Sequence, residues 1–257
     1  MRTKYCCKKV EINTTAADSL LLSHENIHLI NHSKVSVRLG EHRISTDRDC
    51  LDETQRSTCN TDEPPIQDID IEKIIAHEDY PQIKDTDIAL LRLKSGFRLD
   101  GIKFIATICL PVSLSQSVDV IKSKEEENVK LIAAGWGISE DNFRQISDVL
   151  KYAELPYVSN EECSGEFREL QKDLPREHQI QLTQNFMCAG GHNKTDSCKG
   201  DSGGPLTCLT PNYNGIDKIF QQGIVSMGIS CDSPTVAPGI YVRVFPYIKW
   251  ILDHLEE

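Results

Sequence analysis

One segment constrains this chain more than any other: residues 196–206 read Asp-Ser-Cys-Lys-Gly-Asp-Ser-Gly-Gly-Pro-Leu. Ser202 is the candidate nucleophile in it, since a serine hydroxyl reacts when a base takes its proton and donors stabilise the oxyanion that forms. Gly200 permits a tight turn that directs its own N–H and that of Ser202 to one point. Gly-Asp-Ser-Gly alone is also typical of an ordinary turn. The match over the whole segment favours a catalytic loop.

Length and charge narrow the classes of protein that this chain can belong to. Its 257 residues suffice for one large all-β domain or two small ones, and we expect one. Twenty-eight basic and 39 acidic residues give a net charge of −11, which argues against nucleic acid and an anionic membrane surface as partners. No apolar run approaches the length of about 18 residues that a membrane span requires.

The number and spacing of the cysteines indicate an extracellular protein. Ten cysteines are spread along the chain without a Cys-x-x-Cys pair, a pattern typical of disulfides and of secreted, extracellular proteins. Residues 1–13 contain no apolar core, so they cannot serve as a secretion signal. We therefore expect that the natural N-terminus is missing from this sequence; export by another route and reduced cysteines are the alternatives.

Apolar periodicity predicts strands followed by a terminal helix. Residues 35–39 and 69–76 alternate as half-buried strands do, and residues 88–93 are apolar at nearly every position, as in a buried strand. Residues 149–158 predict another strand, and residues 160–163 open a short helix. The buried face of an amphipathic C-terminal helix is predicted to consist of four residues at helical spacing after Pro246: Ile248, Ile251, Leu252 and Leu255.

Three histidines, His24, His28 and His32, lie four residues apart and would share one face of a helix. Of acidic or thiol groups, only Glu25 accompanies them at ligand spacing, so we predict that they bind no metal.

The serine segment resembles the catalytic-serine loop of the trypsin and chymotrypsin family of serine proteases. Further matches follow in the family's order, among them Asp-Ile-Ala-Leu-Leu from Asp87 and Leu-Ile-Ala-Ala-Gly-Trp-Gly from Leu131. The resemblance implies an all-β fold of two antiparallel six-stranded barrels with a C-terminal helix. Residues 34–257 would form this peptidase domain, and residues 1–33 an atypical segment that is either a remnant of the first barrel or foreign sequence.

The same resemblance assigns catalytic roles. Ser202 would be the nucleophile and Asp87 the acid that orients the base, while Gly200 and Ser202 would supply the N–H groups of the oxyanion hole. Ser226 matches the serine that hydrogen-bonds the orienting acid. The alternative for Asp87 is an ordinary loop aspartate that caps the end of a strand.

A substrate pocket is implied as well. Asp196 matches the aspartate at its base, where a carboxylate would pair with a substrate Arg or Lys and direct cleavage after that residue. Gly228 and Gly239 match wall positions that leave room for such a long side chain, and Met227 stands where the family usually has Trp. The strands that wall the pocket would be residues 222–231 and 237–244.

A polar stretch at residues 43–65 contains Cys50 and Cys59, and it predicts a surface loop closed by a disulfide between them. Members of the arthropod clip-domain branch of the family carry such a loop. In some members it binds calcium, for which Glu41 would be a ligand here; no other cofactor is implied.

The resemblance further implies disulfides Cys163–Cys188 and Cys198–Cys231. Cys109 matches the cysteine that joins the family's catalytic domain to its propeptide, and the cysteines that remain for it are Cys6 and Cys7. Cys208 has no identified partner, because the family's partner position is Leu131 here.

The chain departs from the family at the catalytic base. The family's Thr-Ala-Ala-His-Cys is matched by residues 15–19, Thr-Ala-Ala-Asp-Ser, so that Asp18 stands in the place of the histidine. A carboxylate is a weak base for a serine hydroxyl at neutral pH, and loss of such a base costs on the order of 10⁶ in turnover. One of the three spaced histidines is the alternative base.

The family's activation terminus, Ile-Val-Gly-Gly, also has no match in this sequence. Its ammonium pairs in the family with the aspartate before the nucleophile, here Asp201. Without that partner, we expect Asp201 either to turn to solvent or to stay buried and unpaired, with the oxyanion hole as in a zymogen. We also expect the first barrel to be incomplete, with an exposed strand edge.

Two hypotheses result. The first is a secreted endopeptidase that cleaves proteins after Arg or Lys in an extracellular immune or developmental cascade, with a serpin-type inhibitor as a further partner. The second is a non-catalytic protease homologue that binds a protease or substrate. We favour the enzyme family and predict that the chain as written is inactive.

Overall fold

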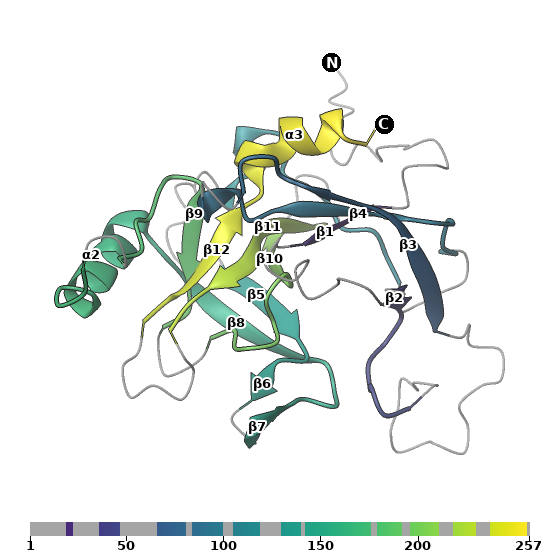
Figure 1. Cartoon of the computed structure of the whole chain (residues 1–257), viewed down its shortest axis with the longest axis horizontal. Coiled ribbons are helices and arrows are strands. Elements are labelled where there is room, and N and C mark those ends of the chain that lie inside the picture. The colour runs from purple at the N-terminus through teal and green to yellow at the C-terminus, as the bar shows by residue number, and fades with distance from the viewer. Residues whose placement is uncertain are drawn as a thin grey trace.

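The computed structural model describes residues 19–22, 36–46, 66–80, 84–99, 105–118, 130–139, 142–175, 179–191, 196–210, 218–229 and 237–255. These residues form a mostly β structure with a closed barrel, a smaller open sheet and a short C-terminal helix (Figure 1). In this part of the chain, no helix is long and apolar enough to cross a membrane.

Six antiparallel strands close the barrel in the order β10-β11-β12-β9-β8-β5. Their bounds are β5 (Lys130–Gly135), β8 (Lys151–Val158), β9 (Phe186–Ala189), β10 (Pro205–Thr210), β11 (Lys218–Met227) and β12 (Gly239–Arg243). Every residue of β9 and β12 is buried, because these strands have packed neighbours on both faces. A core cluster that includes Leu131, Leu206 and Tyr241 stabilises the barrel.

The other sheet has four strands in the order β1-β4-β3-β2. They are β1 (Ser19–Leu22), β2 (Ser36–Leu39), β3 (Gln67–Ala76) and β4 (Ala89–Leu93). Within the described residues this sheet does not close into a barrel. β1 pairs with β4 from Ser19 opposite Arg92 to Leu22 opposite Ala89, so a part of the segment 1–33 pairs with this sheet.

The two sheets share a hydrophobic core. Ile75 of β3 and Leu90 of β4 belong to the same cluster of buried side chains as Ile224 of β11 and Val242 of β12. Burial of this apolar surface fixes the sheets relative to each other. A one-turn 3₁₀ helix, η3 (Lys84–Thr86), ends directly before Asp87 and therefore places that residue beside this shared core.

Helix α2 (Asn160–Leu170) follows β8, as the sequence predicts, and the Ser159 side chain caps its N-terminus by accepting the Glu162 N–H at 3.2 Å. A hairpin of β6 (Ile138–Ser139) and β7 (Asn142–Ile146) stands out from the barrel and has no counterpart in the sequence prediction. The described residues also include two further one-turn 3₁₀ helices, η4 (Leu114–Gln116) and η6 (Phe245–Tyr247).

The C-terminal helix α3 (Ile248–Asp253) differs from the prediction at one position. Ile248 and Ile251 are buried as expected, but Leu252 is 40% exposed. Trp250 makes the additional contact instead: its ring stacks on His77 at 5.1 Å and its indole N–H donates to Glu78 at 3.0 Å. The helix thus turns its Trp250 side to the end of β3, and Leu252 is left outside.

Candidate active site

Asp87 lies at the junction of the two sheets. It is 1% exposed, and Ser226 in β11 donates its hydroxyl hydrogen to Asp87 Oδ2 at 2.7 Å. A buried carboxylate requires such donors, because it loses its hydration in the interior. The structure thus brings together the two residues that the sequence pairs, and it holds the carboxylate in a fixed orientation.

Ser202 lies in a turn that is fastened to β11. The Gly203 N–H donates to the Val225 carbonyl at 2.8 Å, and the Val225 N–H donates to the Gly204 carbonyl at 2.9 Å. Gly203 has a φ of 83°, a conformation that glycine adopts without strain. Gly200 has a φ of 103°, so the segment before Ser202 turns sharply as the sequence predicts.

The Asp196 carboxylate lies in close contact with two glycines. Burial raises the pKa of its carboxyl group to about 6, although the Ser197 N–H and the Tyr241 hydroxyl donate to Oδ1 at 2.7 and 3.3 Å. A Cβ atom on Gly239 would lie 2.6 Å from this oxygen, and one on Gly190 would lie 2.9 Å from the carboxyl carbon. The carboxylate therefore requires glycine at both neighbouring positions.

Gly190 is a neighbour of the Asp196 carboxylate that the sequence analysis did not single out. The sequence feature that could have indicated it is the pair Gly190-Gly191, whose φ values of 84° and 75° favour glycine. Gly228 lies opposite Gly239, since a Cβ on Gly228 would be 3.8 Å from the Gly239 Cα. Met227, at the end of β11, pairs with Ile240 and packs against the shared core.

The expectation for Asp201 is wrong in this structure. Its carboxylate neither turns to solvent nor stays unpaired: Oδ1 accepts the Gly137 N–H at 2.8 Å and Oδ2 accepts the Cys198 N–H at 2.9 Å. Side-chain patterns could not reveal these partners, because both donors belong to the backbone. The N–H groups take over part of the stabilisation that a cation would supply.

The cysteines of the described residues agree with a disulfide-bonded protein. Cys163 in α2 and Cys188 in β9 form a disulfide with an S–S distance of 2.01 Å, the pairing that the sequence predicts. Cys109 and Cys198 are also disulfide-bonded. Cys208 is a buried thiol in β10.

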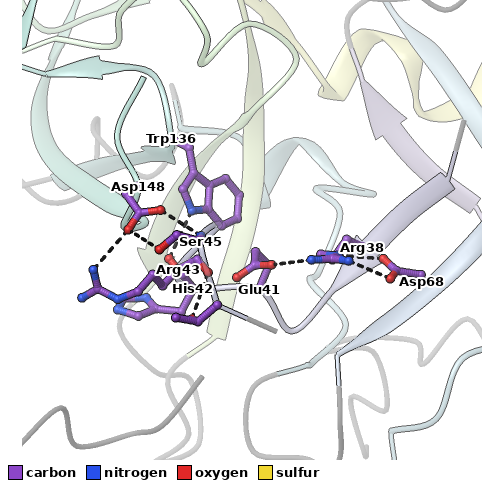
Figure 2. A network of polar contacts seen from close by, with 9 residues as sticks. Arg38, Glu41, His42, Arg43, Ser45, Asp68, Trp136 and Asp148 are labelled. Carbon is purple, nitrogen blue, oxygen red and sulfur yellow. Dashed lines mark hydrogen bonds and ion pairs between the residues drawn. The ribbon is translucent and has the colours of Figure 1, made fainter. Parts of the chain in front are cut away.

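The proposed calcium ligand Glu41 belongs to a polar network between the open sheet and the barrel (Figure 2). Arg38 Nη1 donates to Glu41 Oε2 at 3.4 Å and forms a two-pronged contact with Asp68 through Nε and Nη2 at 2.8 and 2.9 Å. Hydrogen bonding to Arg38 also lowers the pKa of the Asp68 carboxyl group. In the described ranges, no group of three or more acidic, His or Cys side chains is arranged to bind a metal.

A second part of this network joins loop 40–46 to the barrel (Figure 2). Asp148 accepts the Ser45 N–H and hydroxyl, both at 2.9 Å, and the Arg43 guanidinium at 3.2 Å. The His42 carbonyl accepts the Trp136 indole N–H at 3.2 Å. These contacts fix the loop against the segment that enters the β6–β7 hairpin.

Several predicted residues lie outside the described residues: Cys6, Cys7, Asp18, His24, His28, His32, Cys50, Cys59 and Cys231. The base position, the spaced histidines, the loop disulfide and the partners of Cys109 and Cys198 therefore stay predictions.

Comparisons with known proteins agree with this geometry. Residues 25–251 match the family model described as Trypsin. The chain is 35% identical over 237 residues to "Serine protease grass" of Drosophila melanogaster, covering 91% of this chain and 56% of the relative. It is 37% identical over 224 residues to "CLIP domain-containing serine protease HP8" of Bombyx mori, covering 86% and 53%, and 37% identical over 224 residues to "Melanization protease 1" of Drosophila melanogaster, covering 85% and 50%.

A solved structure is similar over most of the chain. The crystal structure of the Drosophila Grass clip serine protease of the Toll pathway matches with a TM-score of 0.72 at 32% identity, covering 93% of this chain and 62% of that one. The chain thus spans about half the length of the curated relatives that it matches, with shares of 50–56%.

Proposed function

Because the chain belongs to the trypsin family of serine proteases, we propose that it forms the Arg/Lys-directed protease domain of an extracellular cascade. The observation that carries this proposal is Asp196, a partly buried residue whose carboxylate lies between Gly190 and Gly239 and is desolvated enough to raise its pKa to about 6. A guanidinium or ammonium group that entered this space would meet a desolvated negative charge, and such a charge binds a cation more strongly than an exposed one does. The similar Grass protease is described as a clip serine protease of the Toll pathway, which supports a role in a pathway of this kind.

Each described catalytic candidate has a role in acyl transfer. Ser202 would attack the carbonyl of the bond after the bound Arg or Lys, and the N–H groups of Gly200 and Ser202 would stabilise the oxyanion. Buried Asp87, oriented by Ser226, would stabilise a protonated base.

The catalytic base is missing from the matching position of this sequence: Asp18 stands where the family has its histidine. An ionised carboxylate there would not activate Ser202 efficiently. The proposal is therefore that this chain binds basic side chains in its pocket and turns substrate over slowly or not at all.

Two measurements on the purified chain test the two halves of this proposal. Fluorescence of p-aminobenzamidine, a small aromatic cation, reports on the pocket; we expect saturable binding that Asp196→Asn abolishes. Labelling by a fluorophosphonate probe reports on Ser202, and we expect labelling no greater than that of Ser202→Ala. Absence of benzamidine binding would refute the specificity, whereas efficient labelling of Ser202 would refute the inactivity.

The second candidate function is a non-catalytic binding protein, which Asp18 also favours. A protein pulled down from haemolymph equally well by the wild type and by Asp196→Asn would support it. Loss of capture in Asp196→Asn would favour the pocket-directed role.

A further inference from the structure

We propose that His77 is a pH-sensitive switch for the C-terminal helix α3: when its imidazole gains a proton, the Glu78 carboxylate turns from Trp250 to His77 and the Trp250 side of the helix loosens. His77 directly follows β3. Histidine side chains ordinarily change charge between about pH 5 and pH 8. The switch involves neither the serine loop nor Asp196, so it does not depend on the proposed function.

The contacts of His77 are those of an uncharged imidazole. The residue is 9% exposed, Trp250 stacks on its ring at 5.1 Å, and Tyr247 meets the ring edge to face at 5.5 Å. Its Nδ1 accepts the Asp79 N–H at 3.3 Å. An amide N–H can only donate, so Nδ1 must present a lone pair, which it does only when the imidazole is neutral.

Glu78 is the group that can respond to a proton on His77. Its Oε2 accepts the Trp250 indole N–H at 3.0 Å and lies 3.9 Å from His77 Nδ1, which is too far for a hydrogen bond. Hydrogen bonds from its own backbone and from Trp250 lower the pKa of the Glu78 carboxyl group, so it is charged where histidine titrates. The Glu78 side chain is 67% exposed and therefore has room to move.

A proton on Nδ1 reverses what this nitrogen can bind. It removes the lone pair that accepts the Asp79 N–H, and it places a positive charge and a donor 3.9 Å from Glu78. The imidazolium attracts the carboxylate by its charge, which the uncharged indole N–H cannot do. Glu78 therefore turns toward His77, and Trp250 loses the acceptor of its N–H.

The second histidine of this cluster does not act in the same way. His254 stacks on Trp250 at 4.7 Å, and its Nδ1 lies 2.8 Å from the Trp250 carbonyl oxygen. A carbonyl oxygen can only accept, so this nitrogen carries a hydrogen whether the ring is neutral or charged. Protonation of His254 therefore leaves its hydrogen bond in place.

The other charged groups near the cluster have contacts of their own. Among the described residues, only Glu78 has a carboxylate within ion-pair distance of His77. In α3, Lys249 pairs with Asp253. The remaining charged or titratable side chains of the packed elements are Asp79 after β3, Asp85 in η3, which accepts the Thr183 hydroxyl, Arg92 in β4, which donates to the His254 carbonyl, and Tyr247 in η6.

Only one side of α3 depends on this contact. Ile248 and Ile251 are buried in the shared core, and the Tyr247 hydroxyl before the helix donates to the Asp85 carbonyl at 2.7 Å. These contacts do not involve a group that changes with His77. The helix has six residues, so the contact of Trp250 is a large share of what holds its last turn. We expect residues 250–255 to open more often when His77 is charged, while the core stays closed.

Amide exchange of the purified chain at two pH values tests the switch. Protection of residues 250–255, relative to an unfolded reference at the same pH, should fall by roughly fivefold or more between about pH 7.5 and pH 5, the effect of losing one hydrogen bond. In His77→Gln, which cannot gain a proton, protection should be equal at both pH values. His254→Gln is the matched control and should show the full fall.

Tryptophan fluorescence assigns the change to Trp250. The sequence has two tryptophans, so Trp136→Phe leaves Trp250 as the only one. With His254→Gln added, His77 is the only histidine of the described residues that stacks on it. The emission maximum should then shift to longer wavelength between about pH 7.5 and pH 5, because the indole gains contact with water, and the shift should vanish when His77→Gln is added.

Three results would overturn the switch. The first is constant protection and constant emission over this pH range. The second is a fall in protection that persists in His77→Gln, and the third is a fall that His254→Gln abolishes, since another group would then be the one that titrates. If His77→Gln fails to fold, Glu78→Gln decides: its amide oxygen still accepts the indole N–H but carries no charge to attract the imidazolium, so a fall as large as in the wild type would refute the switch.

Discussion

Partial burial of Asp196 raises the pKa of its carboxyl group, and this shift sets the pH range in which the proposed pocket would attract a cation. Its pKa of about 6 means that the carboxyl group loses its charge in mildly acidic solution. We predict that the affinity for p-aminobenzamidine is constant above pH 7 and falls by roughly tenfold at pH 5, since only the ionised form attracts the cation. Titrations at several pH values measure this. A constant affinity from pH 5 to pH 8 would contradict it.

The same residue makes folding pH-dependent. The pKa of Asp196 in the folded protein lies above the usual value of 3.8, so the group favours the folded state below about pH 4 and this contribution is lost as the pH rises through 6. Asp196→Asn should therefore raise the free energy of unfolding by about 2 kcal/mol at pH 8 and by much less at pH 4. Urea denaturation at both pH values tests this. An equal effect at both would show that burial of the charge is not the cause.

The Ser226 hydroxyl donates a hydrogen bond to the carboxylate of Asp87. Removal of its hydroxyl leaves Asp87 with one hydrogen bond fewer in a site that is 1% exposed. Ser226→Ala should lower the free energy of unfolding by about 1–3 kcal/mol. Ser36→Ala, on the exposed side of β2, is the control and should have little effect. A Ser226→Ala protein as stable as the control would show that other groups satisfy Asp87.

The sequence predicted the partners of some residues in this site and not those of others. Asp87 and Ser226 carry side chains whose pairing follows from the family pattern, and the structure places them at 2.7 Å. The partners of Asp201 are backbone N–H groups, which no pattern of side chains encodes. Gly190 was missed for a related reason, because its importance lies in the absence of a Cβ next to Asp196.

At the scale of elements, α2 is joined to the barrel covalently. The Cys163–Cys188 disulfide links the helix to β9 across a sequence separation of 25. Replacing both cysteines with alanine should lower the free energy of unfolding by about 3 kcal/mol, because the unfolded chain gains the entropy of an open loop. Urea denaturation without reductant measures the difference. A loss below about 1 kcal/mol would indicate that packing of Phe167, rather than the bond, holds the helix.

Strong periodicity determined which elements the sequence could predict. β3, β4 and β8 have alternating or continuous apolar residues, and they form close to the expected ranges. The β6–β7 hairpin has no such pattern, because it stands out from the barrel and its exposed Ile146 has no core to face. Leu252 has the helical spacing of a core residue, yet Trp250 makes the contact instead, by stacking on His77 just after the end of β3.

At the scale of the whole molecule, the two sheets meet through their shared core and through the polar junction at Asp148 (Figure 2). Asp148→Ala removes the acceptor of three hydrogen bonds from Ser45 and Arg43. Amide exchange in residues 42–46 should then become several-fold faster, while exchange in β9 stays unchanged. Asp173→Ala, an exposed acidic position in the loop after α2, is the control for the loss of one charge.

The pKa of Asp148 gives this junction a pH dependence that can be measured in the wild type. Hydrogen bonds from Ser45, and then the charge of Arg43, hold the pKa of this carboxyl group below its usual value. A lowered pKa means that the junction is fully stabilised above about pH 4 and is lost as the pH falls through the folded-state pKa. Protection of residues 42–46, relative to an unfolded reference, should therefore persist from pH 7 to about pH 4 and decrease below it. Loss of protection already between pH 7 and pH 5 would assign the fastening of the loop to a group other than Asp148, because its carboxylate stays charged over that range.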